Sequence, residues 1–548
     1  MSYIIGLYSI PDISNDPYPM LVHDHNLAVL EDGKLISYLH LERYTRTKYD
    51  SSLPKKFKNI IKNLNLTDRS DQVFIFTDHE IGRASIGLDG DVRFEASYSP
   101  VLKGEIEPGR FYFYGQWPEA YVINHELAHL YSCIPFYGDF KENSLLVHFD
   151  GGASLSNFSA WTFRNNKIKL LESHYSYKWL SALFNANALV FSMVKAKKDD
   201  QNSVPGKFMG LEAFGEYIAE IENWLVKNNF FSNIWSRKKD FFCSVKSTFG
   251  IDIGHIDNKD PFIQDIAATI HEIFVRESLK AFERLAEITN SEYLYYSGGS
   301  ALNIKLNARL HNSGLFKEVF IPPCTGDSGL AIGAAVAGSI HKGFKIEKVS
   351  PYLNNYLIED YKYYSYTEKE ISLAGDMLAA GKVIAVCNGY GEAGPRALGN
   401  RSILGRADRK SIAKRISTES KQREWYRPVA PIMLLKNAEL FTGIEKFPQI
   451  ADFMLMEYEI LPEAKTMIAG CVHSDGTSRI QILRERNQNK YIYDLLNYLD
   501  RKYGIKALIN TSFNRKGEPI VHTHKEAIES ASAMSLDGVV LNGKLKKL

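Results

Sequence analysis

The chain has 548 residues, of which 45% are hydrophobic and 24% charged, a balance typical of a folded protein with more than one domain. A formal net charge of +2 excludes a global electrostatic preference for nucleic acid or membrane. Five cysteines without a CxxC pair argue against a disulfide framework or a cysteine zinc site and fit a reducing compartment.

The sequence predicts neither a secretory leader nor a membrane span. Its start, MSYIIGLYSIPDISND, lacks a basic segment and carries Pro and Asp early. The longest apolar run, near GLAIGAAVAGSI, is too short to cross a bilayer. We therefore expect a cytoplasmic protein with no membrane partner.

Strands are predicted to dominate the first part of the chain. The run YIIGLYSI (3–10) predicts one strand, and LAVLEDGKLISYLHLE (27–42) predicts two strands around an Asp-Gly turn. HELAHLYSCI (125–134) predicts a helix that lies between strands at 71–79 and 143–174.

Helices and strands then alternate. Segment 262–290 has apolar positions at helical spacing and predicts a long helix. A strand, a glycine turn and a helix follow over 292–314 and again over 317–343. This repeat predicts an α/β fold with glycine turns suited to nucleotide phosphates.

A break in this rhythm predicts a domain boundary. Segment 345–370 has no clear period, and a new helix–strand unit begins after it. We predict two domains, 1–355 and 356–548.

The stretch HELAH (125–129) fits the H-E-x-x-H pattern of zinc peptidases, in which Glu126 would be the base. On a helix, His125 and His129 lie on one face and can share an ion. Because the motif also arises by chance, buried or surface histidines with ordinary hydrogen bonds are an equal alternative.

Two aspartates favour a metal site of another kind. Asp150 ends a predicted strand before a glycine pair, and Asp327 lies in a glycine turn that opens a helix. At such positions a carboxylate can reach a metal while backbone N–H groups hold a phosphate. Two histidines and two aspartates suit Fe(II), Mn(II) or Zn(II).

Four C-terminal motifs predict an anion site: GEAGPRALGNRSIL, KQREWYRPVAP, HSDGTSRIQ and INTSFNRKGEPIV. Basic residues outnumber acidic ones between Arg396 and Arg427. A solvated helix face and nucleic-acid binding are the alternatives. Because the arginines lie among Gly, Pro and apolar residues, a small phosphorylated substrate is favoured.

Together these motifs resemble a known family. HELAH, DGG, SGGSALN and GDSGLAIGAA resemble the TsaD-like branch of the actin/sugar-kinase ATPase fold. The whole chain resembles the NodU/CmcH O-carbamoyltransferases, which include tobramycin-type enzymes. HDHNLAVLEDGKLISYLHLERYTRTKYD is similar to that family's HDASA…DG…EERFTRxKH, and PGKFMGLEAFG to its GKxMGLAxYG. HDHN and LERY depart from the pattern on the acceptor side.

The resemblance implies an α/β chain with an actin-like, TsaD-like domain followed by a YrdC-like domain. It implies catalytic roles for His23 and Asp24, with His23 as candidate base; a loop histidine that only orients the strand end is equally expected. The implied metal ligands are His125, His129, Asp150 and Asp327. The implied nucleotide-binding residues are Gly151, Gly152, Lys207, Gly298, Gly299, Asn303 and Gly326. The implied carbamoyl phosphate ligands are Arg396, Lys421, Arg427, Arg479, Asn510 and Ser512, with His473 as a neighbour.

The resemblance also implies the chemistry. Carbamoyl phosphate and Mg-ATP give carbamoyladenylate, phosphate and pyrophosphate, and the carbamoyl group then passes to an acceptor hydroxyl. Fe(II) is the expected metal, with Mn(II) or Zn(II) as alternatives.

The expected acceptor is a sugar, an antibiotic or another natural product. A hydroxymethylated base in DNA is the alternative, suggested by the basic and aromatic segment 228–246, although a surface helix and loop explain that segment better. The rival functions are a zinc metallopeptidase and a non-enzymatic ATP-dependent binding or assembly protein. A homodimer is the expected assembly.

Overall fold

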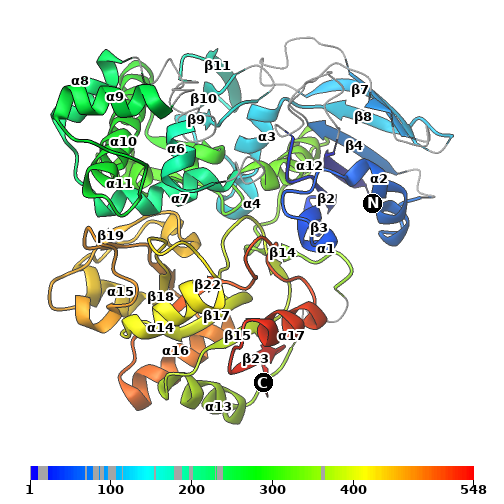
Figure 1. Ribbon diagram of the computed structural model, residues 1–548. Helices are drawn as coiled ribbons and strands as arrows, with labels where there is room; N and C mark the ends of the chain where they lie inside the picture. The colour runs from blue at the N-terminus through cyan, green and yellow to red at the C-terminus, as the bar shows by residue number, and fades with distance from the viewer. Residues whose placement is uncertain are drawn as a thin grey trace.

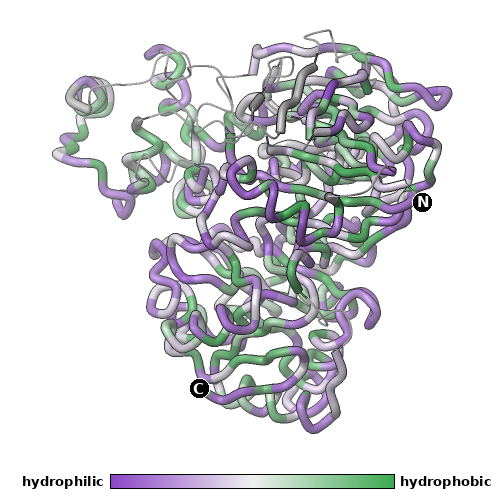
Figure 2. The backbone as a smooth tube through the Cα atoms, turned by 90° about the vertical axis from the view of Figure 1, so that its right-hand side faces the viewer, coloured by the Kyte–Doolittle hydropathy of each residue, from purple (hydrophilic) through white to green (hydrophobic). Residues whose placement is uncertain are grey.

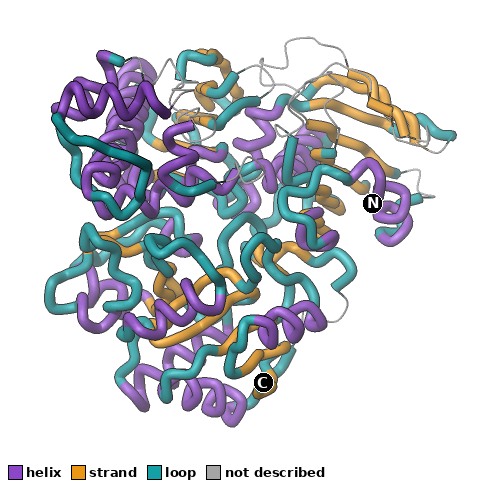
Figure 3. Tube along the Cα trace, in the orientation of Figure 1, coloured by secondary structure: helices purple, strands orange, loops and turns teal. Residues whose placement is uncertain are grey.

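The structure is a computed structural model. It describes residues 2–9, 22–67, 71–77, 85–86, 92–96, 106–113, 115–153, 156–177, 188–196, 202–228, 230, 238–358 and 364–548. Figure 1 shows two parts, an N-terminal part in blue to green and a C-terminal part in yellow to red below it. Figure 3 shows that both parts combine helices with sheets.

The first sheet of the N-terminal part has the strand order β3-β2-β1-β4-β8-β7-β6-β5. Strand β1 pairs antiparallel with β2 and parallel with β4, and β4 pairs parallel with β8. The predicted turn at Asp32-Gly33 joins β2 and β3. The strands are β1 (Tyr3–Tyr8), β2 (Asn26–Glu31), β3 (Lys34–His40), β4 (Gln72–Thr77), β5 (Ser85–Ile86), β6 (Val92–Ala96), β7 (Glu107–Phe113) and β8 (Glu119–Val122).

The second sheet repeats this plan in the order β11-β10-β9-β12-β13. Strand β9 pairs antiparallel with β10, β10 antiparallel with β11, and β9–β12–β13 are parallel. In both sheets, three consecutive antiparallel strands are thus followed by two parallel strands. This duplication confirms the predicted α/β, actin/sugar-kinase-like fold. The strands are β9 (Ser144–Phe149), β10 (Phe158–Arg164), β11 (Lys167–His174), β12 (Tyr293–Ser297) and β13 (Glu318–Phe320).

The helices of this part largely follow the predictions. The long helix predicted over 262–290 spans Pro261–Thr289 as α10, and the Asp260 side chain caps it by accepting from Phe262 N. The other helices are α1 (Leu41–Thr45), α2 (Leu53–Asn63), α3 (His125–Tyr131), α4 (Ile134–Tyr137), α6 (Ala188–Met193), α7 (Val204–Leu211), α8 (Ala219–Lys227), α9 (Lys238–Phe249), α11 (Ile304–Asn312) and α12 (Leu330–His341). None of the helices described is both long and apolar enough to cross a membrane.

Helix α12 lies at the centre of the N-terminal part, where it contacts α3, β1, β2 and β4. Its small residues make this packing possible. A Cβ on Gly333 would lie 1.7 Å from the carbonyl oxygen of Ala128 in α3. The position of α3 therefore depends on a glycine at 333.

Gly333→Ala is expected to destabilise the protein by more than about 3 kcal/mol or to prevent folding, because backbone rather than a movable side chain opposes the new methyl group. Urea unfolding would measure the loss. The matched control is Gly206→Ala, also in a helix, where a Cβ meets nothing within 4 Å. Equal stability of both variants would contradict this account of the packing.

The C-terminal part is built on a mixed seven-stranded sheet in the order β21-β18-β22-β17-β15-β23-β24. Helices α13 and α16 pack together against this sheet through an apolar cluster. The strands are β15 (Ile384–Cys387), β17 (Arg401–Arg406), β18 (Ala430–Leu434), β21 (Gln481–Leu483), β22 (Ala507–Ser512), β23 (Gly538–Leu541) and β24 (Lys544–Lys547). The helices are α13 (Glu368–Ala379), α14 (Lys410–Lys414), α15 (Leu435–Thr442), α16 (Lys490–Tyr503) and α17 (His524–Ala533).

The segment predicted as a linker, 345–370, contains a short strand, β14 (Tyr352–Asn354), that pairs with β16 (Gly391–Glu392). Within the segment, residues 359–363 lie outside the described residues. The largest apolar cluster is continuous between the two parts, because it joins Val204 and Phe208 of α7 to Tyr426 and Val429. In Figure 2 hydrophobic stretches run through the interior of both parts.

Candidate active site

The two histidines of HELAH lie on one face of α3, His125 at its first residue and His129 in its last turn. Asn124, the residue before α3, caps this helix because its side-chain oxygen accepts a hydrogen bond from Leu127 N at 2.8 Å. His125 and His129 are fully buried, and their Nε2 atoms lie 3.0 Å apart. Two imidazole nitrogens that face one point are the arrangement that the i, i+4 spacing predicts.

The two predicted aspartates meet these histidines. Asp327 Oδ1 lies 3.6 Å from His125 Nε2 and 3.5 Å from His129 Nε2, and Asp150 Oδ2 lies 3.7 Å from His129 Nε2. Gly299 N donates to Asp150 Oδ2 at 2.6 Å. Burial and then the neighbouring Asp327 raise the pKa of the Asp150 carboxyl. One buried and one partly buried carboxylate beside two buried imidazoles fit a divalent cation, although this donor set does not separate Fe(II), Mn(II) and Zn(II).

A third histidine, His148, also belongs to this cluster and was not predicted. It is fully buried in β9, and its ring lies 5.2 Å from that of His129. One donor atom from each of His125, His129, His148 and Asp150 lies within 4.8 Å of the others. The sequence signal was present, because side chains two residues apart on a strand share a face.

The glycine turns surround this cluster. Gly298 has a φ of +108°, and a Cβ there would lie 2.3 Å from the carbonyl oxygen of Phe149. Gly298 N also donates to Thr325 O at 2.9 Å, which joins the turn after β12 to the turn that carries Gly326 and Asp327. Asn303 caps α11 by accepting from Leu306 N at 3.0 Å. Gly151 and Gly152 directly follow Asp150.

Lys207 points elsewhere. Its Nζ lies 3.2 Å from Glu424 Oε1, in the C-terminal KQREWYR segment. The structure therefore places Lys207 at the contact between the two parts.

His23 and Asp24 border the metal-site candidates. His23 Nδ1 lies 2.9 Å from Asp24 Oδ2, and His23 Nε2 lies 3.8 Å from Asp327 Oδ2. His40, which was not predicted, lies 2.9 Å from the other oxygen of Asp24. Burial would lower the pKa of His23, but Asp327 and Asp24 outweigh it and raise the value to about 9.

Burial raises the pKa of Asp24, yet hydrogen bonds from His23 and His40 outweigh burial and hold it well below its usual range. The His23 side chain is 26% exposed, so a substrate can reach it.

The C-terminal motifs bring five cationic side chains together. Burial, followed by the nearby arginines, lowers the pKa of Arg396 to about 10, that of Arg423 to about 9, and that of Arg479 well below its usual range. Among the described residues, the Nε atoms of Arg396 and Arg479 are buried without a hydrogen-bond partner. We call Arg396, Lys421, Arg423, Arg427 and Arg479 the basic cluster. Such a concentration of partly buried positive charge fits an anionic ligand.

Ser512 lies within the basic cluster. Lys421 Nζ donates to Ser512 Oγ at 3.2 Å and to Asn514 Oδ1 at 2.8 Å. Arg423, missed from the sequence, lies 3.4 Å from the same hydroxyl. Asn510 of β22 donates to Gln481 Oε1 of β21 at 2.6 Å, across the intervening strand β18. Arg423 could have been found as the third cation of the KQREWYR segment.

The peptidase alternative needs Glu126 as a base on bound water. In the structure Glu126 is fully buried and its Oε1 accepts from Ser156 N at 3.2 Å and Ser156 Oγ at 3.3 Å. Glu126 thus anchors the segment before β10, as a supporting residue would.

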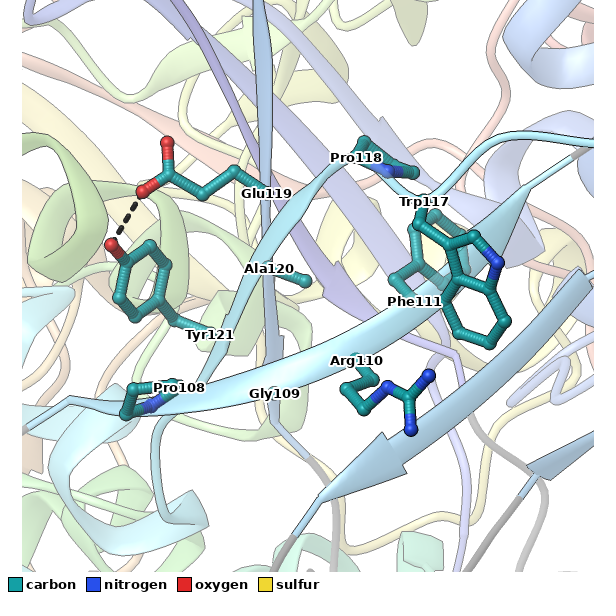
Figure 4. A pocket seen from close by; sticks show the side chains of 9 residues that line it. All are labelled: Pro108, Gly109, Arg110, Phe111, Trp117, Pro118, Glu119, Ala120 and Tyr121. Carbon is teal, nitrogen blue, oxygen red and sulfur yellow. Dashed lines mark hydrogen bonds between the residues drawn. The ribbon is translucent and has the colours of Figure 1, made fainter.

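A cavity of about 340 Å³ lies elsewhere, on strands β7 and β8. Figure 4 shows its lining, with Arg110 beside Trp117 and Tyr121 donating to Glu119 at 2.5 Å. No residue of the predicted sites lines this cavity.

Comparison with known proteins identifies the family of this chain. Residues 115–336 match the family model of the carbamoyltransferase N-terminus, and residues 375–547 match that of the carbamoyltransferase C-terminus. Nodulation protein U of Rhizobium tropici is 34% identical over 537 residues, covering 91% of this chain and 90% of that protein. The 3'-hydroxymethylcephem-O-carbamoyltransferase of Streptomyces clavuligerus is 26% identical over 546 residues, covering 95% and 96%.

Among solved structures, component A of the (R)-2-hydroxyglutaryl-CoA dehydratase of Acidaminococcus fermentans aligns with a TM-score of 0.33 and 12% identity, over 63% of this chain and 100% of that chain. Similarity at this level adds nothing to the fold that the strand order defines.

The matched families and the relatives define an enzyme that transfers carbamoyl groups. The chain belongs to the NodU/CmcH-type O-carbamoyltransferase family, and the resemblance expected from its motifs is confirmed.

Proposed function

We propose that this carbamoyltransferase works in two steps at two sites. The observation that carries the proposal is the separation of the basic cluster, in the C-terminal part, from the histidine–aspartate cluster in the N-terminal part. Residues 356–548, expected to be YrdC-like, form the donor-activating unit. Residues 1–355, expected to be TsaD-like, form the transfer unit.

In the first step, water splits carbamoyl phosphate into carbamate and phosphate, and a carbamate oxygen attacks the α-phosphorus of Mg-ATP. Pyrophosphate leaves and carbamoyladenylate remains. The basic cluster neutralises the phosphates of both substrates, and Ser512 hydrogen-bonds the bound anion. Because the arginine charges already face one another, the anion relieves their repulsion when it binds.

In the second step, an acceptor hydroxyl attacks the carbamoyl carbon and AMP leaves. A divalent cation on His125, His129, Asp150 and Asp327 would supply a Lewis acid beside the AMP phosphate. Asp24 accepts a hydrogen bond from His23 Nδ1, so that Nε2 faces the site. Because burial is outweighed by Asp327 and Asp24, which raise the pKa of His23 to about 9, the ring would accept the hydroxyl proton once a bound divalent cation offsets the charge of Asp327. The glycine turns let the backbone approach the nucleotide closely.

The test is a product balance. With ATP, carbamoyl phosphate and a hydroxyl acceptor, the protein is expected to release pyrophosphate, phosphate and AMP and to yield an acceptor heavier by one carbamoyl group in a mass spectrum. Omission of carbamoyl phosphate should stop pyrophosphate release. Pyrophosphate release that persists without it would refute the first step.

For the acceptor, we propose the hydroxyl of a sugar, an antibiotic or another natural product. A relative is named for a hydroxymethylcephem acceptor, which supports a small molecule with a primary hydroxyl. The same mass assay with hydroxymethylated DNA tests the alternative, for which binding should weaken steeply with salt.

A further inference from the structure

A series of hydrogen bonds and ion pairs connects the N-terminal part to the C-terminal part, outside the two sites described above. Its centre is Lys305, in the first turn of α11. Lys305 Nζ lies 3.0 Å from Glu212 Oε2 and 3.1 Å from Asp475 Oδ2. Glu212 belongs to the N-terminal part and directly follows α7, whereas Asp475 belongs to the C-terminal part. One ammonium group thus joins a carboxylate from each part.

On the C-terminal side, the contacts lead into the basic cluster. Asp475 Oδ1 accepts from Thr477 N at 3.0 Å and from Thr477 Oγ1 at 2.8 Å. The Thr477 hydroxyl lies 3.0 Å from His473 Nδ1. Arg479 follows two residues after Thr477, so the loop 473–479 links Asp475 to the basic cluster.

On the N-terminal side, the contacts lead to the nucleotide turn. Asn303 Nδ2 donates to His271 Nε2 at 2.8 Å. Burial lowers the pKa of His271 to about 3, so the ring is neutral and carries its proton on Nδ1. That nitrogen lies 3.7 Å from Glu212 Oε2, the oxygen that also faces Lys305. Asn303 and Lys305 are therefore linked through His271 and Glu212.

Lys305 is the cation that balances several carboxylates here. Burial raises the pKa of Glu212 to about 7 and that of Glu457 to about 8, while Lys305 acts on both in the opposite direction. Without Lys305, the buried carboxylates would lose their counter-charge and take up protons. Glu212 would then no longer hold Asp475 through a shared cation.

We propose that Lys305 is a positioning residue that keeps the Asn303 turn and the loop 473–479 in register, so that an adenylate made at the basic cluster passes to the transfer site without escaping. The inference rests on the proposed two-step function. It differs from a merely stabilising ion pair in one respect. A stabilising pair affects both steps equally, whereas this bridge affects the passage between them.

Lys305→Met tests the passage. Pyrophosphate release and carbamoyl transfer are measured in the same reaction, and their ratio reports how much adenylate reaches the acceptor. We expect pyrophosphate release within about threefold of the wild type and transfer lowered at least about tenfold, because positioning contributes large factors to transfer rates. Lys305→Arg, which keeps the charge and the reach, should restore most of the ratio.

The matched control is Arg309→Met, one turn further along α11. Arg309 pairs with Glu272 at 2.5 Å on the surface, and its side chain is 44% exposed. It should leave the ratio unchanged. Should Lys305→Met fold poorly, Asp475→Asn serves instead, because it removes the same ion pair without a change of shape. A ratio that stays at the wild-type value in either variant overturns the inference, as does a parallel loss of both activities.

A binding measurement separates failure of this inference from failure of the proposed function. Calorimetry gives the affinity for carbamoyl phosphate with and without AMP. Coupling between the two ligands in the wild type, lost in Lys305→Met, supports the bridge whatever the chemistry is. Equal coupling in both proteins overturns it. Wild-type protein that releases no pyrophosphate refutes the two-step function alone.

Discussion

Replacing Arg479 by methionine is expected to abolish pyrophosphate release and, at the same time, to make the unliganded protein more stable to heat. Arg479 lies among Arg396, Arg423 and Arg427, and burial together with these neighbours lowers its pKa well below the usual range. Its Nε is buried and finds no partner among the described residues. A charge kept in such surroundings is unfavourable in the empty protein and is compensated when an anion binds.

We expect pyrophosphate release to fall at least about a hundredfold, which is the usual effect of losing one donor to a reacting anion. The melting temperature of the unliganded variant should rise by about 1 to 2 °C, because methionine fills similar space without charge. Saturating carbamoyl phosphate should reverse the order, since it stabilises the wild type and binds the variant weakly. Differential scanning calorimetry measures both temperatures.

The control is Arg486→Met in the same part of the chain. Arg486 forms a surface pair with Asp494 at 2.7 Å, and its side chain is 54% exposed. Its loss should change neither pyrophosphate release nor stability appreciably. Normal pyrophosphate release by Arg479→Met would show that the basic cluster is not the donor site.

His129→Ala should separate the two steps in the opposite sense. His129 is the residue of the cluster that lies near both carboxylates, 3.5 Å from Asp327 Oδ1 and 3.7 Å from Asp150 Oδ2. We expect the purified variant to contain less than about a tenth of the wild-type metal and to transfer carbamoyl groups at least about a hundredfold more slowly. Pyrophosphate release should stay within about threefold, because the basic cluster is intact.

Metal content by mass spectrometry and the two activities form one experiment, with His255→Ala at an exposed histidine as control. If His129→Ala retained its metal, the assignment of the ligands would be wrong. If single-turnover measurements showed that it lost both activities in parallel, His129 would be needed for the donor step as well as for transfer.

Local patterns were enough to predict several elements of the N-terminal part, among them α3, which carries His125 and His129. The long helix α10 and the hairpin of β2 and β3 follow from periodicity and a turn signal, which act over a few residues. The strand order, in which β1 pairs with β4 and β9 with β12, does not, because pairing joins residues far apart in the sequence. The duplicated plan was accessible only through the family resemblance.

The site residues that the sequence did not predict were missed for one shared reason. His148 lies in a strand whose residues are all buried, so only its position beside the His129 ring distinguishes it from a core residue. His40 and Arg423 belong to the sites because folding brings them within hydrogen-bond distance of Asp24 and Ser512, respectively. Lys207 shows the reverse, since its motif was recognised while its partner Glu424, in the other part of the chain, was not. Sequence motifs thus identify a functional side chain more readily than the side chains that it contacts in the folded protein.

The apolar cluster that passes from α7 to Tyr426 and Val429 has a consequence for the folding of the enzyme. Because buried side chains of both parts complete the same cluster, cutting the chain between the parts would expose apolar surface on each fragment. The whole chain should therefore lose its structure in a single cooperative transition, and separately expressed fragments should aggregate or remain partly unfolded. The N-terminal and C-terminal parts should in this sense fold as one unit.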